Sequence, residues 1–425
     1  MADATQKTVV LAFSGGLDTS YCLVHLRELG WDVVTVTVDT GGFSDAKLTE
    51  ISARAAELGT SRHITIDART RFYDEFVANL IRANYLRGGG YPSCTGSERV
   101  VVASEAARTA VELGADAIAH GSSGAGNDHV RFDVTIRAEA RGIEILAPIR
   151  DGEVIREAEV AELAKRGYGT AGSAKTDGVG MNMAAPYSTN EGMAGGTIGG
   201  VETDGSWEYL PEHAWETTAA IADAPDAGIE VVIDFAAGLP VSLSGEGVRA
   251  RTWTGPDLLN VLAGLAAKNA VGRGIHLGTT IMGFKGRVGF EAPGMLVVIA
   301  AHRELERLTL TNRQIQVKDP LGNAYGDLLH EGLHGDPVAC DIEALLASSQ
   351  ARVEGAVRVR LVKGNIIVLG SRSPYSLLDS GRRLGSTYGH SSTLWTGSEA
   401  RAFAKIYGLQ AQIAAEAARG NDELP

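Results

Sequence analysis

The chain has 425 residues, of which 44% are hydrophobic and 21% are charged, and its formal net charge is −13. This length predicts two or three domains, and the acidic balance argues against nucleic acid or an anionic membrane surface as the main partner. Three widely spaced cysteines without a CxxC pair argue against a disulfide framework or a zinc ribbon. No apolar run approaches the roughly 18 residues of a spanning helix, and the polar N-terminus lacks the apolar segment of a signal peptide. We therefore expect a cytoplasmic protein.

The first 150 residues alternate between predicted strands and predicted helices. Apolar or β-branched runs predict strands at 9–13, 33–38, 63–66, 117–119 and 143–149, and apolar spacing predicts helices at 21–29, 46–58, 72–85 and 100–113. Such alternation is typical of an α/β fold, a doubly wound parallel sheet with helices on both faces. Ligands of these sheets bind at the carboxyl ends of the strands. The loops that begin at Ser14, Asp39 and His120 should therefore converge on one edge.

The pattern changes after about residue 167. Residues 167–208 are rich in Gly, Ser, Thr and Asn, and the chain beyond them predicts strands at 228–235, 239–243, 357–361 and 366–369 and helices at 258–268 and 295–308. We interpret residues 1–167 as a nucleotide-binding domain and residues 168–395 as a second, α+β domain. The alanine-rich residues 398–419 predict one amphipathic helix in a C-terminal segment, 396–425, which packs on a neighbouring subunit or on its own domain.

The strongest functional signal is the stretch Ser14-Gly15-Gly16-Leu17-Asp18-Thr19-Ser20, between a predicted strand and a predicted helix. Its adjacent glycines let the backbone approach an anion, and the following helix N-terminus supplies free N–H groups. It is not a Walker A loop, which requires GxxxxGK[ST], and the near-match at 169–176 has Ala174 in place of the essential glycine. The stretch predicts a phosphate cradle; the alternative is an ordinary Ser/Gly turn with a helix cap.

SGGLDTS resembles the pyrophosphate-binding loop of the ATP pyrophosphatases, which cleave ATP into AMP and pyrophosphate. Further stretches resemble one family of that group, argininosuccinate synthetase: HGSSGAGNDHVRF at 120–132, APYS at 185–188, EAPG at 291–294, and KGN at 363–365 with SPYSL at 373–377. The resemblance runs in order along nearly the whole chain. It implies an ATP-dependent, AMP-forming ligase, in which citrulline attacks the α-phosphorus of ATP, pyrophosphate leaves, and the amine of aspartate displaces AMP.

The resemblance also implies roles for individual residues, with ATP and Mg²⁺ as cofactors, aspartate and citrulline or a related acceptor as small-molecule substrates, and a homotetramer as the assembly. The implied catalytic residues are Ser14, Asp18 and Lys285, and Asp18 is also the implied metal ligand. ATP is implied to contact Ala12, Ser14, Gly15, Gly16, Leu17, Asp18, Thr19, Ser20, Val38 and Gly121. Aspartate is implied to contact Ser123, Asn127, Asp128 and Thr95. The acceptor is implied to contact Tyr91, Arg131, Ser188, Thr197 and Phe290.

The chain departs from the family pattern around the acceptor. A citrulline-binding serine, an ammonium-binding glutamate and a citrulline-binding tyrosine of the family are replaced here by Gly96, Gly278 and Phe290. Ala125 also replaces a lysine beside the aspartate motif. Two interpretations stay open. Either other side chains compensate and citrulline is the acceptor, the candidates being Ser97, Glu98 and His276, or the enzyme adenylates another ureido, amide or carboxyl acceptor in secondary metabolism.

Two other classes of function are weighed against this one. A tRNA-modifying ATP pyrophosphatase generally needs paired catalytic cysteines and a basic RNA-binding face, and the scattered cysteines and the charge of −13 count against it. A non-catalytic nucleotide-binding protein would not need the full loop and the aspartate motif. Retention of Ser14, Asp18, Asn127 and Asp128 counts against that class.

Overall fold

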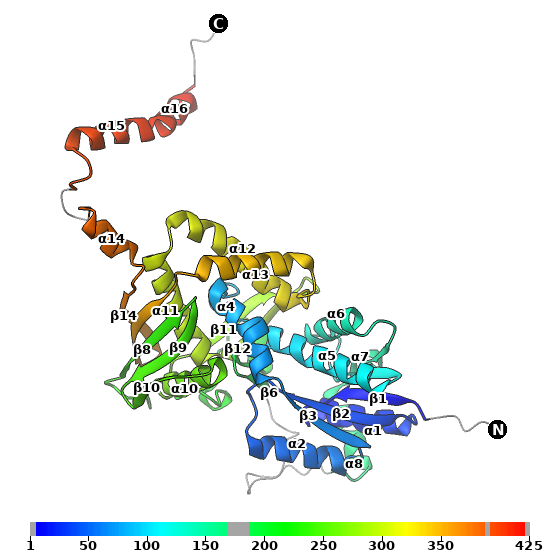
Figure 1. The fold of residues 1–425 in the computed structure, drawn as a ribbon. Coiled ribbons are helices and arrows are strands. Elements are labelled where there is room, and N and C mark those ends of the chain that lie inside the picture. Colours follow the sequence, from blue (N-terminus) through cyan, green and yellow to red (C-terminus); the bar gives the residue numbers. More distant parts are fainter. Residues whose placement is uncertain (1–5, 169–186, 387–391, 421–425) are drawn as a thin grey trace.

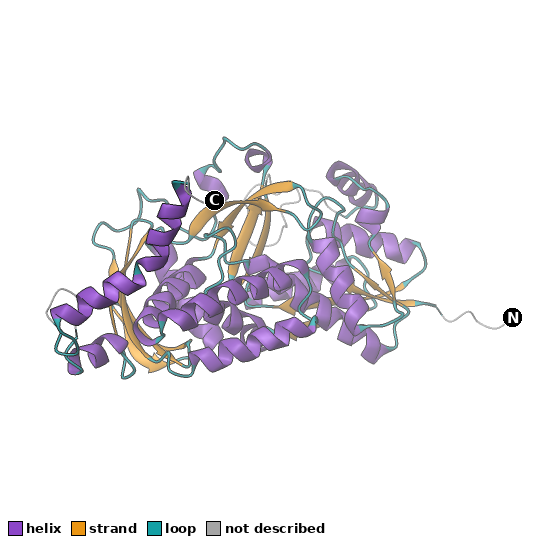
Figure 2. Cartoon of the chain, turned by 90° about the horizontal axis from the view of Figure 1, so that it is seen from above, coloured by secondary structure: helices purple, strands orange, loops and turns teal. Residues whose placement is uncertain are grey.

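The computed structural model describes residues 6–168, 187–386 and 392–420 and contains three sheets (Figure 1). A parallel sheet forms the N-terminal part, and two antiparallel sheets form the C-terminal part. The four-stranded antiparallel sheet lies between the other two along the molecule (Figure 2). The expected α/β class is confirmed. None of the described helices is both long and apolar enough to cross a membrane.

The N-terminal sheet has five parallel strands in the order β3-β2-β1-β4-β5, with β1 in the middle. The strands are β1 (Thr8–Ala12), β2 (Asp32–Asp39), β3 (Arg62–Asp67), β4 (Ala117–Ala119) and β5 (Glu144–Leu146). Alternate residues of β1 enter two different cores, because successive side chains of a strand point to opposite faces. Val9 and Leu11 pack with Leu23 of one helix layer, whereas Val10 and Ala12 belong to the core on the other face.

Helices cover both faces of this sheet, as predicted. Those below it in Figure 1 are α1 (Leu17–Glu28), α2 (Asp45–Glu57) and α8 (Arg156–Lys165), and those above it are α5 (Cys94–Leu113) and α6 (Asp128–Glu139). The short helix α7 (Pro148–Asp151) begins inside the predicted strand 143–149. The strand therefore ends earlier than predicted, since proline has no N–H for the sheet and is favoured in the first turn of a helix.

Two predicted helices differ in detail. The segment 72–85 consists of α3 (Arg69–Phe72), a π-helical turn (Tyr73–Val77) and α4 (Ala78–Ala83) rather than one regular helix. Helix α5 begins at Cys94, six residues before the predicted start at 100. Thr95, Gly96 and Arg99 therefore lie on the first turns of a helix and not in a loop.

The larger antiparallel sheet has the order β10-β9-β8-β13-β14. Its strands are β8 (Ile229–Ala236), β9 (Leu239–Gly245), β10 (Val248–Thr252), β13 (Gly355–Val362) and β14 (Asn365–Arg372). The turn between β13 and β14 contains Lys363 and Gly364, with φ of 45° and 81°. Positive φ at both central residues suits a tight hairpin. The helices of this part are α10 (Gly255–Lys268), α11 (Pro293–Thr309), α12 (Asn312–Glu331) and α13 (Pro337–Gln350).

The middle sheet has the order β11-β12-β7-β6 and was not predicted. Its strands are β6 (Ser188–Gly192), β7 (Gly195–Gly199), β11 (Arg273–Thr279) and β12 (Lys285–Glu291). The short helix α9 (Val201–Asp204) and a 3₁₀ turn (Glu212–Ala214) come after β7 in the chain. Strands β6 and β7 lie inside the glycine-rich stretch 167–208. Glycine is required there by close backbone approach: a Cβ at Gly196 would lie 2.5 Å from the carbonyl oxygen of Asn190.

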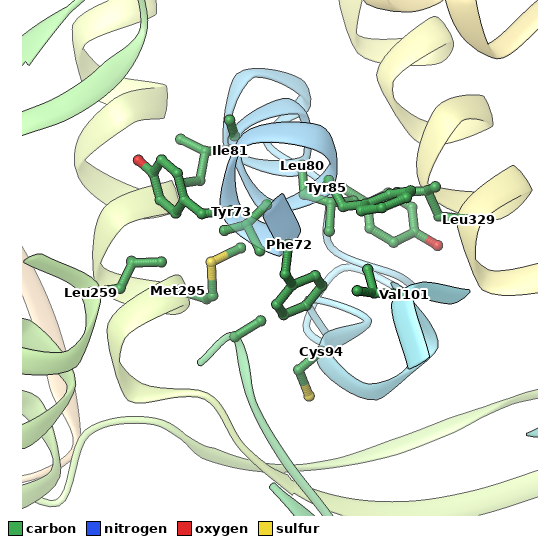
Figure 3. Close-up of a cluster of buried hydrophobic side chains, with 14 of the residues drawn as sticks. Phe72, Tyr73, Leu80, Ile81, Tyr85, Cys94, Val101, Leu259, Met295 and Leu329 are labelled. Carbon is green, nitrogen blue, oxygen red and sulfur yellow. The ribbon is translucent and has the colours of Figure 1, made fainter. Parts of the chain in front are cut away.

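One apolar core joins the N-terminal and C-terminal parts. Figure 3 shows Phe72, Tyr73 and Val101 from α3 to α5 together with Met295 and Leu329 from α11 and α12. All five side chains are buried. Because close-packed cores resist displacement, this shared core fixes the end of α12 next to the N-terminal helices.

The C-terminal tail stands away from the body of the molecule (Figure 1). It contains α14 (Leu377–Arg383), α15 (Gly397–Tyr407) and α16 (Leu409–Ala418), so Gly408 divides the single helix predicted at 398–419. Every residue of α15 and α16 is exposed, including Phe403, Ile406 and Tyr407. Within the described chain α15 and α16 therefore do not pack on their own domain, whereas α14 lies against α11.

Candidate active site

The SGGLDTS segment forms the turn after β1 and the first turn of α1, which begins at Leu17. Ser14 and Asp18 are exposed to solvent, and the Ser14 hydroxyl lies 3.3 Å from that of Thr19. Gly15 has a φ of 73°, a value that glycine adopts without steric cost. The start of α1 leaves backbone N–H groups without helical partners. Hydroxyls, a tight glycine turn and a helix N-terminus thus lie where the phosphate cradle is expected.

Gly121 brings the end of β4 against this loop. A Cβ at Gly121 would lie 3.2 Å from Thr19 Cγ2 and 3.3 Å from the Asp18 carbonyl carbon, so the strand ends converge as expected. The ten residues assigned to ATP differ in exposure. Ser14 and Asp18 are exposed, Gly16, Thr19 and Gly121 are partly buried, and Ala12, Gly15, Leu17, Ser20 and Val38 are buried. The buried members shape the loop through packing.

Asp18 has a neighbour that the sequence did not indicate. Glu159 of α8 is buried and hydrogen-bonded to Asp18, and its Oε2 atom has no partner among the described residues. Burial, followed by the nearby Asp18 carboxylate, raises the pKa of Glu159 to about 8. The Glu159 carboxyl therefore holds its proton at neutral pH.

A second set of charges lies after β4. The His120 Nε2 atom lies 3.1 Å from Asp133 Oδ1, and Arg150 Nη1 lies 3.0 Å from the same oxygen. Burial alone would raise the pKa of Asp133, but the hydrogen bonds with His120 and Arg150 hold it at about 2. These contacts fix the strand end that carries Gly121.

The aspartate motif is built around the carboxylate of Asp128. Its Oδ1 accepts from Arg131 Nη1 at 2.6 Å, and its Oδ2 accepts from Arg99 Nε at 3.2 Å. Burial opposes ionisation, but the two guanidinium groups lower the pKa of Asp128. Arg99 also reaches Glu98 at 3.4 Å, and Glu98 accepts from the Thr40 hydroxyl at 2.6 Å. A continuous polar chain therefore runs from the end of β2 to α6.

The other residues assigned to aspartate surround this chain. Ser123 is exposed in the loop before α6. Asn127 Oδ1 accepts from the backbone N–H of Ile281 at 2.9 Å, which ties the motif to the middle sheet. The Thr95 hydroxyl lies 2.9 Å from the Tyr91 hydroxyl and so faces the acceptor residues.

The acceptor residues form an aromatic wall on the middle sheet. The Tyr91 ring stacks on His276 with centroids 5.0 Å apart and meets Phe290 at 5.2 Å. Phe290 on β12 lies opposite Thr197 on β7 in the strand register. Ser188 is exposed at the start of β6. The structure thus groups Tyr91, Phe290 and Thr197.

Arg131 was expected to contact the acceptor, but its guanidinium is buried and makes most of its hydrogen bonds to other residues of the protein. Besides Asp128, it contacts His330 at the end of α12: Nε donates to the backbone oxygen at 2.7 Å, and Nη2 lies 3.1 Å from Nδ1. No motif or predicted element pointed to His330, because α12 was not predicted. It is the main residue of the site that sequence reasoning missed.

At two of the positions where the chain departs from the family pattern, a neighbouring side chain lies close to the place of the missing Cβ. A Cβ at Gly278 would lie 2.4 Å from His276 Nε2, so the His276 ring occupies that space. A Cβ at Gly96 would lie 2.9 Å from the Ser93 hydroxyl and 3.5 Å from Arg131 Nη2. Ala125 is exposed. Lys285 donates to the Thr279 hydroxyl at 2.7 Å.

Comparison with known protein families identifies the class of enzyme. The model described as the argininosuccinate synthase N-terminal HUP domain matches residues 8–168, and that of the argininosuccinate synthase C-terminal domain matches residues 187–414. The chain belongs to the argininosuccinate synthase family. The predicted family and its class of enzyme, an ATP-using ligase that forms carbon–nitrogen bonds, are thereby confirmed. The exact boundaries proposed for the domains stay predictions.

Relatives from bacteria and archaea resemble this member of the argininosuccinate synthase family over most of their length. The argininosuccinate synthase of Xanthomonas campestris is 36% identical over 98% of this chain and 100% of the relative. That of Hyperthermus butylicus is 37% identical over 96% of this chain and 98% of the relative. That of Methanocaldococcus jannaschii is 35% identical over 88% of this chain and 90% of the relative.

Two stretches named in the sequence analysis lie wholly or partly outside the described residues. They are the Walker-like stretch 169–176 and the first two residues of APYS at 185–188. In the described part of the chain, no group of three or more His, Cys, Asp or Glu side chains is arranged to hold a metal ion. A metal site at the loop would therefore depend on Asp18 and the substrate phosphates.

Proposed function

We propose that the protein joins aspartate to citrulline with consumption of ATP, forming argininosuccinate, AMP and pyrophosphate. The observation that carries the proposal is the complete SGGLDTS loop, open at the carboxyl end of β1 with Ser14 and Asp18 exposed. Family membership supports the substrates, since the relatives are named argininosuccinate synthases. The tRNA-modifying and non-catalytic alternatives have no comparable support.

The loop suits cleavage between the α- and β-phosphorus of ATP. Negative charge develops on the departing pyrophosphate, and donors fixed in advance at that place lower the barrier. The hydroxyls of Ser14 and Thr19 and the N–H groups at the start of α1 would supply such donors. Lys285 is exposed on β12, and its ammonium would add positive charge on the substrate side.

The residues at the loop fit a magnesium ion, which brings charge neutralisation to the phosphates when bound. Mg²⁺ binds through one or two carboxylates together with substrate phosphates. The exposed carboxylate of Asp18 would hold it.

The substrates would bind between the loop and the middle sheet. Asn127 would donate to a carboxylate of aspartate, and Asp128 would offer its remaining lone pairs to the ammonium. Tyr91, Ser188, Thr197 and Phe290 would line the acceptor site, with Arg131 for its carboxylate. These groups hold the nucleophile in place rather than supply a strong base, because positioning and charge neutralisation provide most of what this transfer needs.

A different acceptor is the second candidate, and it rests on one observation. The family's ammonium-binding glutamate is Gly278 here, and the His276 ring lies 2.4 Å from the place of its Cβ. An unpartnered buried ammonium costs several kcal/mol, of the order of 2–5. Citrulline would then bind weakly unless His276 or Glu98 compensates.

The test measures pyrophosphate and AMP from Mg-ATP and aspartate with citrulline and with other ureido, amide and carboxylate acceptors. Efficient turnover with micromolar citrulline supports the proposed reaction. Turnover only with another acceptor supports the second candidate. ADP and phosphate as coupled products contradict both.

The proposal includes a homotetramer in the cytoplasm. The exposed apolar side chains of α15 and α16 support a subunit contact, because large apolar surfaces on a folded chain mark association sites. The three unpaired cysteines fit a reducing compartment.

A further inference from the structure

His330 joins the two parts of the molecule at the acceptor site. It is the penultimate residue of α12 in the C-terminal part, and it contacts Arg131 on α6 of the N-terminal part. The Arg131 Nε donates to the His330 carbonyl oxygen at 2.7 Å, and Nη2 lies 3.1 Å from the ring nitrogen Nδ1. Both side chains are buried, with exposed fractions of 6% and 4%.

The chemistry of this contact requires a neutral imidazole whose Nδ1 accepts a hydrogen bond, because a guanidinium only donates. Burial, followed by the positive charge of Arg131, lowers the pKa of His330 to about 2. Arg87 and His276 lower this pKa further, and Asp128 opposes them. The carbonyl belongs to the last turn of α12, where the negative end of the helix dipole favours a cation.

Gly96 leaves room for the pair. A Cβ at this position would lie 3.5 Å from both Arg131 Nη2 and His330 Cα, and 2.9 Å from the Ser93 hydroxyl. That hydroxyl in turn lies 3.4 Å from His330 Nδ1. The small residue on α5 therefore lets Ser93, Arg131 and the end of α12 approach one another.

We propose that His330 is the positioning residue for acceptor binding, through Arg131. A guanidinium has five N–H groups, and the contacts with His330 and Asp128 engage three of them. Two N–H groups remain, one on Nη1 and one on Nη2, on a guanidinium held by the end of α12, and donors on neighbouring nitrogens suit a carboxylate. The inference rests on the proposed function, in which the acceptor carries a carboxylate.

The test compares steady-state constants of the full-length protein and three variants. His330→Ala removes the ring acceptor and keeps the carbonyl, and we expect KM for citrulline to rise about tenfold, as for the loss of one hydrogen bond to a charged group. KM for ATP should change less than twofold. His330→Asn supplies an amide oxygen that can accept from Nη2, so it should restore KM for citrulline to within about threefold of wild type.

His334→Ala is the matched control. His334 follows α12, packs edge-on against Phe76 and lies 3.8 Å from Glu139. It makes no hydrogen bond or ion pair with Arg131, whose partners are His330 and Asp128. Its loss should lower the melting temperature as much as that of His330 while leaving KM for citrulline unchanged. An unchanged KM in His330→Ala, or an equal rise in His330→Asn, overturns the proposal.

A measurement without turnover separates this inference from the proposed function. Nitrogen-15 spectra of histidine-labelled protein, assigned by the signal missing in His330→Asn, should show a neutral His330 ring between pH 5 and 8. A ring that titrates near pH 6.5, as free histidine does, overturns the contact with Arg131. Absence of pyrophosphate release by wild type with citrulline contradicts the proposed function alone, and the spectra then decide the inference.

Discussion

Asp128 and Arg131 form an ion pair across one turn of α6, with Oδ1 and Nη1 2.6 Å apart. The same carboxylate binds Arg99 on α5, and the same guanidinium binds the end of α12. The pair therefore links helices from both parts of the chain. Breaking a buried pair on one side leaves the remaining charge uncompensated.

Asp128→Asn should destabilise the protein and abolish ligation. The amide leaves Arg99 and Arg131 without their shared anion. Because the Asp128 side chain is 34% exposed, the loss should cost less than the about 3–5 kcal/mol of a fully buried pair. Chemical denaturation and pyrophosphate release measure the two effects. Asp379→Asn, which removes an exposed carboxylate 3.5 Å from Arg382, is the control and should change stability by less than about 0.5 kcal/mol. Equal stability of the two variants would contradict the role given to Asp128.

Ser14→Ala should lower kcat about a hundredfold, since it removes one donor to the departing pyrophosphate. Asp18→Asn should raise the Mg²⁺ concentration needed for half-maximal activity. The control is Ser44→Ala, which removes the side chain that caps α2 and should cost about 1 kcal/mol of stability without lowering kcat. Near-wild-type turnover in both loop variants would make the loop a structural turn.

Gly278→Ala should displace the His276 ring from Tyr91, because the new Cβ would lie 2.4 Å from His276 Nε2. We expect a higher KM for the acceptor, as in His276→Ala. The double variant should resemble either single variant, since both disturb one contact and such effects are not additive. Additive effects on KM would show that the two positions act separately.

The tail should be needed for assembly. Light scattering of the full chain is expected to give a tetramer, and a chain that ends near residue 395 should give a smaller species. The reason is the apolar surface of α15 and α16, where Phe403, Ile406 and Tyr407 are all exposed. A monomer in both samples would contradict the tetramer.

Acid stability should depend on Asp133. Its folded pKa of about 2 lies below the ordinary value of 3.8, so its ion pairs stabilise the fold above about pH 4, and that stabilisation is lost as the pH falls toward 2. Asp133→Asn should be less stable than wild type at pH 5, and the difference should shrink by pH 3. Denaturant midpoints at these pH values measure it. A constant difference would show that the pKa of Asp133 is ordinary.

The sequence by itself determined the parallel sheet, the loop after β1 and the family. Those features are local: a buried strand reads as a continuous apolar run, and a phosphate cradle is a short stretch of glycines and hydroxyls before a helix. The two strands in the glycine-rich stretch were not predicted, and this failure also has a physical reason. Strands β6 and β7 are held by backbone pairing with few large side chains, so they carry no apolar alternation.

Only the tertiary structure decided how the site residues are used. Arg131 and His330 are 199 residues apart in the chain, and Glu159 reaches Asp18 from another helix. Neither contact has a sequence signature, because packing of α12 and α8 brings these groups together. The family motif names Arg131, but its partners and its burial follow from the shared core that holds α12 against α6.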